Sequence, residues 1–537
     1  MERFIETYKD EQFDVIVIGG GITGAAVAYD AASRGLSVAL VGKGDFGCAT
    51  SAATSKFIHG GLRYLKTFEF ALVRESLRER RIMENIAPNF VYPLACMFTS
   101  PSLVINIGLY LYDILAFDKG FTWDKKKKIP NHSSMSRDRA LREEPNVKRD
   151  GFTGAGIYYD CISICPERLT LAFVKSAEQC GARVANYAKA EDFIITGDGS
   201  VAGVVARDLV KNKKYSIRAS CTVNCAGPWA DEVLGMAKKG DSGHAIQRSE
   251  GIHIIVDSRT KTYAVGTMTK KQHFFLIPWR GKTLIGTTDK VYPGSPDGYR
   301  VTRRSIEELL DLVNANFGND DPIRYKDVRF AYGGLRPLVG SDGGDSYTTT
   351  RKYEVIDHAA EGLGGLITAE GGKYTTSRNL AEQVLRALEK RLGRKLAKCV
   401  TASQRLAGCD IDDVDAFIGK IKRENPDIAP STMEYLGRHY GTDYSGVAEL
   451  ARKDKKLREP LNADGEILAQ VVYAIEHEMA FTLKDILFRR TGIGTLGHPG
   501  AKVLNAVADL AAKKLKWSAE RKKKELREAE EAFRLPK

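Results

Sequence analysis

Three glycines near the start of the chain have the spacing of a turn that binds the phosphates of a dinucleotide. Gly19, Gly21 and Gly24 fit the pattern G-x-G-x-x-G. In this pattern the first glycine permits a tight turn, the second lets backbone approach a pyrophosphate, and the third lets a helix pack on a strand. The free N–H groups at the start of that helix then face the phosphates. The spacing predicts dinucleotide binding, with an ordinary tight turn as the alternative.

The residues around these glycines predict the strand, helix and strand that position such a turn. Residues 14–18 form a short, β-branched apolar run, which is typical of a strand buried on both faces of a parallel sheet. Residues 25–28 open a helix, and residues 36–41 form a second strand. The second strand of this unit ordinarily ends in Asp or Glu, whose carboxylate binds the adenosine ribose. Gly42 stands at that place, so the usual ribose contact is missing.

Length, charge and cysteine content limit the class of protein. A chain of 537 residues is too long for one hydrophobic core, so we expect two or three domains. The formal net charge of +13 favours acidic partners, which include phosphorylated substrates, anionic lipid and nucleic acid. The nine cysteines are scattered and odd in number, which argues against a disulfide framework and indicates a reducing compartment. Their spacing predicts no metal site.

One apolar stretch has two interpretations. Residues 103–117 are the most apolar part of the chain but are too short to span a membrane. Phe121, Trp123 and a run of lysines at 125–128 follow. Together they describe either a helix lying in a membrane interface or a buried helix followed by a solvated loop. The polar N-terminus lacks the apolar core of a secretory signal.

The rest of the chain alternates strands with helices and ends in helices. Strands around 253–256, 274–279 and 284–289 predict an antiparallel sheet that holds a substrate. A later strand at 366–371 leads through a glycine turn into a helix at 377–392, and the sequence beyond residue 397 is mostly helical.

Eight motifs together make a family resemblance. They are the glycine turn at 19–24, TSKFIHGGLRYL at 54–65, NCAGPW at 224–229, IPW at 277–279, IGTTD at 285–289, GLRPL at 334–338, GGKYTT at 371–376 and VVYAIEHE at 471–478. In this order they resemble the FAD-dependent glycerol-3-phosphate dehydrogenases, over nearly the whole chain. The resemblance implies an α/β fold with a Rossmann-type FAD-binding domain, an antiparallel-sheet substrate domain and an all-α C-terminal domain. The expected boundaries are 1–95 with 150–235 and 330–395, 96–149 with 236–329, and 396–537.

The resemblance also implies an activity and its partners. The expected reaction oxidises sn-glycerol 3-phosphate to dihydroxyacetone phosphate with non-covalent FAD and passes electrons to a membrane quinone. An oxidase branch of the family passes them to oxygen instead and makes hydrogen peroxide. The implied location is cytoplasmic, peripheral on the inner membrane, with a homodimer as a possible assembly. A flavin-containing nucleic-acid-binding protein is the alternative of another class, but the basic residues are dispersed and no nucleic-acid motif is present.

The same resemblance assigns site residues. Phosphate binding favours guanidinium groups, and Arg336 and Arg351 are the candidates. Arg63 and Tyr64 are expected at the substrate, and Lys373 beside the flavin. His253 is the expected base, with His59 as its rival, because imidazole accepts a proton near neutral pH. The expected cofactor-binding residues are Gly19, Gly21, Gly24, Thr54, Ser55, Lys56, His59, Gly60, Ala226, Gly227, Gly372, Lys373 and Thr375.

The adenosine ribose needs a separate prediction. The family normally ends the second strand with Glu, and this chain has Gly42. We expect Lys43, Asp45 or nearby backbone to hold the ribose instead, and FAD to bind less tightly.

Overall fold

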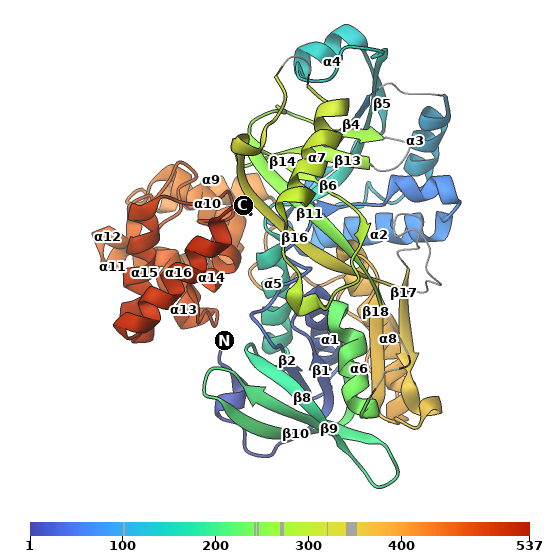
Figure 1. Ribbon diagram of the computed structural model, residues 1–537, viewed down its shortest axis with the longest axis vertical. Coiled ribbons are helices and arrows are strands. Elements are labelled where there is room, and N and C mark those ends of the chain that lie inside the picture. The colour runs from blue at the N-terminus through green and yellow to red at the C-terminus, as the bar shows by residue number, and fades with distance from the viewer. Residues whose placement is uncertain (100–102, 241–242, 244–245, 269–272, 319–320, 340–351) are drawn as a thin grey trace.

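The computed structural model describes all residues except 100–102, 241–242, 244–245, 269–272, 319–320 and 340–351 (Figure 1). The strands are β1 Gln12–Ile18, β2 Val38–Val41, β3 Phe57–Ile58, β4 Val91–Thr99, β5 Ser133–Ser136, β6 Gly154–Ser163, β7 Arg183–Ala185, β8 Ala188–Ile195, β9 Val201–Asp208, β10 Lys213–Asn224, β11 Gln247–Asp257, β12 Ala264–Met268, β13 His273–Trp279, β14 Lys282–Gly286, β15 Lys290–Val291, β16 Val328–Leu338, β17 Tyr353–Asp357 and β18 Leu366–Gly371. The helices are α1 Ile22–Ser33, α2 Phe70–Ile86, α3 Leu103–Leu115, α4 Arg137–Glu143, α5 Pro166–Gln179, α6 Ala230–Lys238, α7 Arg303–Asn316, α8 Ser377–Leu392, α9 Val414–Glu424, α10 Pro430–Tyr440, α11 Tyr444–Lys453, α12 Lys455–Arg458, α13 Ala469–His477, α14 Leu483–Asp485, α15 Ala501–Leu515 and α16 Ala519–Phe533.

The first sheet is built around β1, as its apolar sequence predicts. Within the described residues it has eight strands, with the order β17-β18-β10-β1-β2-β7, with β9 paired to β10 and with β8 paired to β9. β1 pairs in parallel with both β2 and β10, which brings Ile18 next to Val41 and Asn224. All four residues of β2 are buried, because helices cover both faces of a sheet of this kind. Helix α1 packs against α5 and α8.

The second sheet is mostly antiparallel and lies above the first in Figure 1. Its ten strands in the described part of the chain have the order β15-β11-β14-β13-β12-β4-β6-β3, with β16 paired to β11 and β5 to β6. The antiparallel strands expected at 253–256, 274–279 and 284–289 correspond to β11, β13 and β14. β6 and β16 also pair in this sheet, so residues 154–163 and 328–338 lie outside the cofactor sheet, unlike the division that the sequence predicts.

The C-terminal helices lie together on one side of the molecule, at the left of Figure 1. The expected helical character of residues 397–537 is present, but the stretch 466–490 is not one helix. It is divided into α13, α14 and a π-helical turn at Ile486–Arg490. All nine cysteines lie in described residues and are free thiols.

Candidate active site

One large cavity connects the glycine turn with the antiparallel sheet. It has a volume of about 1190 Å³ and is lined by residues of both sheets. This exceeds the roughly 300–1,000 Å³ of ordinary small-molecule pockets and suits an extended ligand. The glycine turn forms one wall, and His253 of β11 and Arg336 of β16 belong to another. A dinucleotide and a small substrate could therefore lie in the same space.

The glycine turn has the geometry that a dinucleotide requires. Gly19 has a φ of 118°, and a Cβ atom there would lie 2.3 Å from the carbonyl oxygen of Cys225. A Cβ atom on Gly24 would lie 1.9 Å from the carbonyl oxygen of Gly19. Larger residues would displace backbone at both positions. The start of α1 lies at the cavity wall, where Ile22 donates its N–H to Ser51 Oγ at 2.9 Å. The residues present therefore fit the pyrophosphate of FAD.

Most of the expected cofactor residues meet at this cavity. The lining includes Gly19, Gly21, Thr54, Ser55, His59, Ala226, Gly227, Gly372, Lys373 and Thr375. Gly24 instead makes the close packing of α1 on the turn. Gly60 donates its N–H to Asp160 Oδ1 at 3.1 Å.

Lys56 does not lie where the sequence predicts. Its side chain is buried and does not line the cavity. The ammonium contacts Glu167 Oε1 at 3.4 Å and lies 4.4 Å from the ring centroid of Trp279. An ammonium group removed from water needs such partners, and this pairing directs it into the protein. The expectation of a cofactor contact from its side chain is therefore corrected.

His253 is a buried histidine in which one ring nitrogen is hydrogen-bonded and the other, also buried, is not. Its Nε2 lies 2.8 Å from Ser55 Oγ, and its ring stacks on Tyr332 at a centroid distance of 5.0 Å. Nδ1 is buried and has no hydrogen-bond partner among the described residues. Burial, assisted by the positive charges of Arg336 and Lys56, holds the pKa of His253 well below its usual value. The neutral imidazole that a general base requires is thus the favoured form.

His59, the rival base, is also kept neutral. Burial and the neighbouring charge of Lys373 lower the pKa of His59 to about 3. Its backbone N–H donates to Thr375 Oγ1 at 3.1 Å, and this hydrogen bond connects the loop that contains His59 to the turn before α8. Both histidines line the cavity, so position alone does not choose between them.

Three of the cationic side chains that line the cavity are residues that the sequence predicts for the site. Arg63 donates from Nη2 to the hydroxyl of Tyr64 at 3.1 Å. Lys373 donates to Ser76 Oγ at 2.8 Å, and its ammonium lies 4.3 Å from the ring centroid of Tyr64. Arg336 donates to Thr287 Oγ1 at 2.7 Å and to the carbonyl of Thr288 at 3.1 Å. These hydrogen bonds fix the position of the Arg336 guanidinium, which belongs to β16, at the cavity wall. Arg351 lies outside the described residues.

Sequence reasoning missed His273. It begins β13 and lines the cavity together with Arg63 and Arg336. Burial, followed by the charge of Arg63, lowers the pKa of His273 to about 3. The available signal was its place four residues before the IPW motif, at the start of the same strand.

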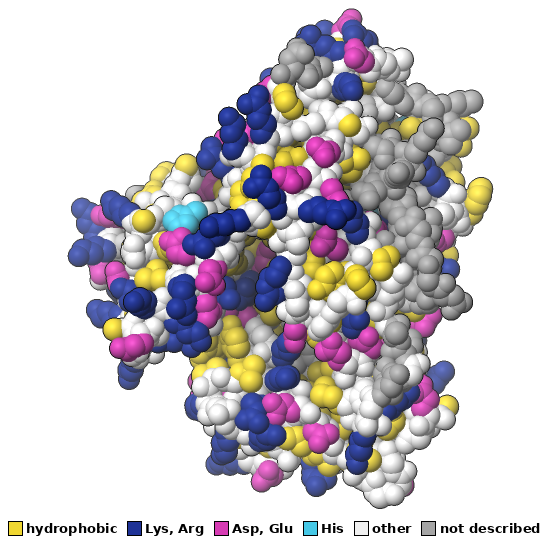
Figure 2. Space-filling view, viewed as in Figure 1, with side chains coloured by type: hydrophobic (Ala, Val, Ile, Leu, Met, Phe, Trp, Pro, Cys, Tyr) yellow, Lys and Arg dark blue, Asp and Glu magenta, His cyan; other side chains and the backbone are white. Residues whose placement is uncertain are grey.

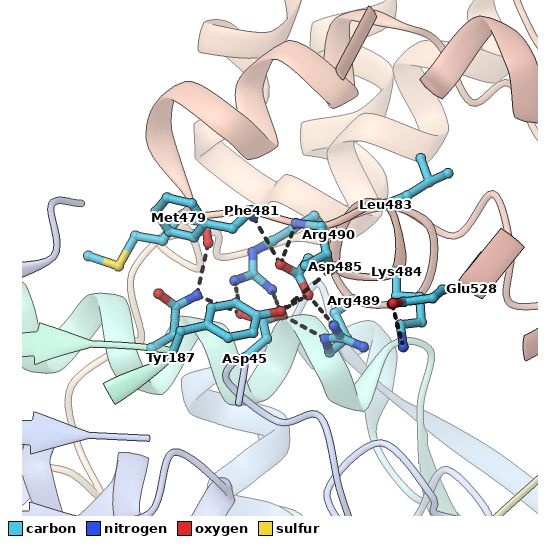
Figure 3. Close-up of polar contacts among 12 residues, drawn as sticks. Asp45, Tyr187, Met479, Phe481, Leu483, Lys484, Asp485, Arg489, Arg490 and Glu528 are labelled. Atoms are coloured by element: carbon cyan, nitrogen blue, oxygen red, sulfur yellow. Dashed lines mark hydrogen bonds and ion pairs between the residues drawn. The ribbon is translucent and has the colours of Figure 1, made fainter. Parts of the chain in front are cut away.

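Asp45 is not available to the ribose. Figure 3 shows its carboxylate facing two arginines of the C-terminal helices. Oδ1 accepts from Arg490 at 2.6 Å and from Asn186 at 3.0 Å, while Oδ2 accepts from Arg489 at 2.6 Å and from Arg490 at 2.9 Å. Arg489 also pairs with Asp485, which accepts from the Tyr187 hydroxyl. Asp45 therefore anchors the loop after β2 to the C-terminal helices, which corrects its expected ribose contact.

Comparisons with known families cover most of the chain. Residues 14–378 match the family described as FAD dependent oxidoreductase. Residues 399–522 match the C-terminal domain of alpha-glycerophosphate oxidase.

Individual relatives match over nearly the full length. A glycerol-3-phosphate dehydrogenase from Synechocystis sp. is 33% identical over 553 residues, covering 99% of this chain and 98% of that protein. An aerobic glycerol-3-phosphate dehydrogenase from Staphylococcus saprophyticus is 34% identical over 513 residues, with 91% and 88% covered. The crystal structure of the glycerol-3-phosphate dehydrogenase from Bacillus halodurans complexed with FAD has a TM-score of 0.80 at 28% identity, covering 99% of this chain and 97% of that chain. The predicted fold and FAD dependence are confirmed, and the chain belongs to the FAD-dependent oxidoreductases as a member of the glycerol-3-phosphate dehydrogenase family.

Proposed function

We propose that the protein oxidises sn-glycerol 3-phosphate to dihydroxyacetone phosphate and passes the electrons to a membrane quinone. The observation that carries the proposal is a single cavity that joins a dinucleotide-type glycine turn to a neutral histidine and a group of cations. The substrate has a phosphate dianion and a secondary alcohol. A cavity for it must supply positive charge for the first group and a proton acceptor for the second.

Each of these needs has a candidate side chain. The planar guanidinium of Arg336, fixed by Thr287 and Thr288, suits bidentate binding of phosphate oxygens. Arg63 and Tyr64 suit the oxygen that becomes the carbonyl. When bound, FAD supplies the hydride acceptor. Lys373 supplies positive charge close to Tyr64. This charge suits stabilisation of the negative charge that would develop on the reduced flavin.

Proton removal is assigned to His253. Its imidazole lies at the cavity with Nε2 2.8 Å from Ser55 Oγ, and this neutral ring is the assigned acceptor of the substrate hydroxyl proton. Ser55 belongs to the loop expected at the flavin, so this hydrogen bond would set the imidazole orientation relative to both ligands.

Anaerobic reduction tests the activity. Addition of glycerol 3-phosphate to the purified yellow protein without oxygen should bleach the flavin absorbance, because hydride leaves the substrate for the flavin. An absorbance that does not change on addition of substrate would refute the proposed reaction. Re-oxidation should then be faster with a soluble quinone than with oxygen. Equally fast re-oxidation by oxygen, with peroxide formed, would replace the quinone by oxygen as the acceptor.

An exposed apolar surface beside the cavity supports a quinone acceptor. We call it the α3 surface. Its side chains have exposed fractions between 58% and 76%. They are Phe68, Ile107, Tyr110, Ile114, Phe117 and Phe121. Ile107, Tyr110 and Ile114 have the spacing of one face of α3, and Phe117 follows the end of that helix. Phe68 and Ile107 also line the cavity. A lipid-soluble molecule at this surface would be next to the cavity.

Charge favours an anionic bilayer as the partner of the α3 surface. Lys66, Lys125 and Lys128 are exposed in the segments that carry its aromatic residues. Elsewhere the basic side chains are spread over the visible face rather than gathered into one patch (Figure 2). No helix among the described residues is long and apolar enough to cross a bilayer. Apolar side chains flanked by lysines are typical of a surface that lies in a membrane interface.

Sedimentation with lipid vesicles tests this surface. The double change Ile114→Glu and Phe117→Glu should lower binding to vesicles with anionic phospholipid at least about tenfold, because it puts charge where apolar side chains would be buried. Turnover with a soluble acceptor should be unchanged. The matched control is Leu209→Glu with Val210→Glu, which changes two side chains that are each 45% exposed on the β9–β10 turn. Unchanged binding in the first variant, or equal loss in both, would exclude the α3 surface.

A further inference from the structure

The end of β2 lacks the carboxylate that would bind the adenosine ribose. Gly42 follows β2 without a side chain, and Asp45 is held by Arg489 and Arg490. The cavity wall here nevertheless contains two other acidic residues, Glu232 of α6 and Asp297. Asp297 lies in a single helical turn, Pro296–Gly298, that follows β15 of the second sheet. The loop after β15 thus reaches across to the first sheet.

Two donors from the first sheet hold the Asp297 carboxylate. Lys43 Nζ lies 2.5 Å from Oδ1, and Trp229 donates its Nε1–H to the same oxygen at 2.9 Å. The Lys43 ammonium also lies 4.5 Å from the ring centroid of Trp229. Lys43 comes directly after the missing acid, and Trp229 follows β10, which neighbours β1. Three residues far apart in the sequence therefore converge at the adenosine end of the cavity.

A stabilising role for the fold does not account for this arrangement. The side chains of Lys43 and Asp297 are 41% and 64% exposed, and exposed ion pairs contribute little to stability. Both donors use Oδ1, and Oδ2 accepts no hydrogen bond from the described residues. An ionised carboxylate with one oxygen fixed and the other open is what a ribose diol requires.

We infer that Asp297 supplies the missing ribose acid from the second sheet, with Lys43 and Trp229 as the residues that position it. Lys43 holds the pKa of Asp297 below its usual value, so the carboxylate is ionised at neutral pH and accepts hydrogen bonds from the ribose hydroxyls. The sheet that carries His253 then also contacts the adenosine end of FAD. Occupancy of that end would couple the two sheets.

Glu232 is the competing carboxylate. It lines the same part of the cavity, but burial raises its pKa, and it lacks the pair of donors that fix Asp297. Without such donors, nothing in the described residues holds the Glu232 carboxylate toward the ribose position.

Dissociation of dinucleotide from the diluted holoenzyme tests the inference. The protein is loaded with FAD or with an analogue whose adenosine ribose lacks both hydroxyl groups, and flavin fluorescence reports release. The parent protein should bind the analogue about tenfold more weakly than FAD. Asp297→Asn should weaken FAD binding by a similar factor and bind the two dinucleotides equally. Lys43→Met should reduce the preference for FAD in the same direction.

Two further variants make the result decisive. Asp321→Asn changes another exposed aspartate, one that pairs with Arg259 and does not line the cavity, and it should keep the full preference for FAD. Glu232→Gln should keep it as well. A preference that survives in Asp297→Asn, or disappears in Glu232→Gln, would overturn the inference. The inference rests on FAD as the cofactor, and the measurement contains no substrate, so failure here is distinct from failure of the proposed reaction.

Discussion

Replacing His253 with glutamine is expected to slow flavin reduction by about 10²–10⁴-fold, the usual contribution of a general base. Glutamine keeps a polar group that can reach Ser55 but removes the imidazole nitrogen that has no partner among the described residues. The KM for glycerol 3-phosphate should change little, because the arginine side chains remain. Anaerobic stopped-flow absorbance at saturating substrate measures the rate directly.

The matched control is the same change at the rival base. His59→Gln should have the smaller effect, since the hydrogen bond that links His59 to Thr375 uses its backbone N–H and survives the substitution. If His59→Gln reduces the rate more than His253→Gln does, His59 is the base. A loss of bound FAD in either variant would show as lower flavin content and is corrected for before the rates are compared.

The pH dependence provides an independent check on the same residue. The pKa of His253 in the folded protein is lowered, so the neutral base persists when the pH falls below 6.5 and is lost only as the pH passes through the lowered value. The rate of flavin reduction at saturating substrate should therefore stay level from about pH 8 to about pH 6. A decline centred near pH 6.5 would indicate an unperturbed base in place of His253.

The parts of the fold that the sequence predicted are those with local signals. The strand, glycine turn and helix at β1 and α1 follow from a β-branched run and a fixed glycine spacing. The helix predicted at 377–392 has those same bounds as α8, because its apolar residues repeat at helical spacing and Gly393 follows it in a left-handed conformation. In both cases a short stretch of sequence contains all the information.

Pairing between distant segments was not predictable in this way. β6 and β16 are apolar strands whose sequences fit either sheet, and only their partners β4 and β11 assign them to the second. The helical pattern at 466–490 likewise does not reveal the π-helical turn that presents Arg489 and Arg490 to Asp45 (Figure 3). Contacts between distant segments determine these features, so the spacing of apolar residues along the sequence does not predict them.

The candidate site shows the same division. The family resemblance predicted His253, Arg336 and Lys373 at one site, and all three line one cavity although they are far apart in the chain. Asp297 was missed because its signal is an ordinary turn sequence, and its partner Lys43 lies 254 residues away. Lys56 was misplaced because a lysine inside a cofactor motif looks the same whether it faces ligand or a buried glutamate.

Replacing Arg336 with alanine is expected to lower kcat/KM for glycerol 3-phosphate by about 30- to 1,000-fold, mostly through KM. This corresponds to about 2–4 kcal/mol, the range for removing one member of a buried charge pair. The guanidinium is fixed by Thr287 and Thr288, so it meets the phosphate with little loss of side-chain freedom. Arg336→Lys should recover only part of the loss, because an ammonium keeps the charge but not the planar fork. Steady-state kinetics with a soluble acceptor measures all three proteins.

A substrate without the phosphate separates phosphate binding from a general disturbance of the site. Glycerol has the same alcohol but no anion, so its slow oxidation should differ little between the parent protein and Arg336→Ala. The charge control is Lys523→Ala, which removes an exposed cation from α16 and should leave both substrates unaffected. Equal losses for Arg336→Ala and Lys523→Ala, or an equal loss with glycerol and glycerol 3-phosphate, would remove Arg336 from the phosphate site. A loss confined to the phosphorylated substrate is the result expected if its anion contacts Arg336, which β16 places next to β11, the strand that carries His253.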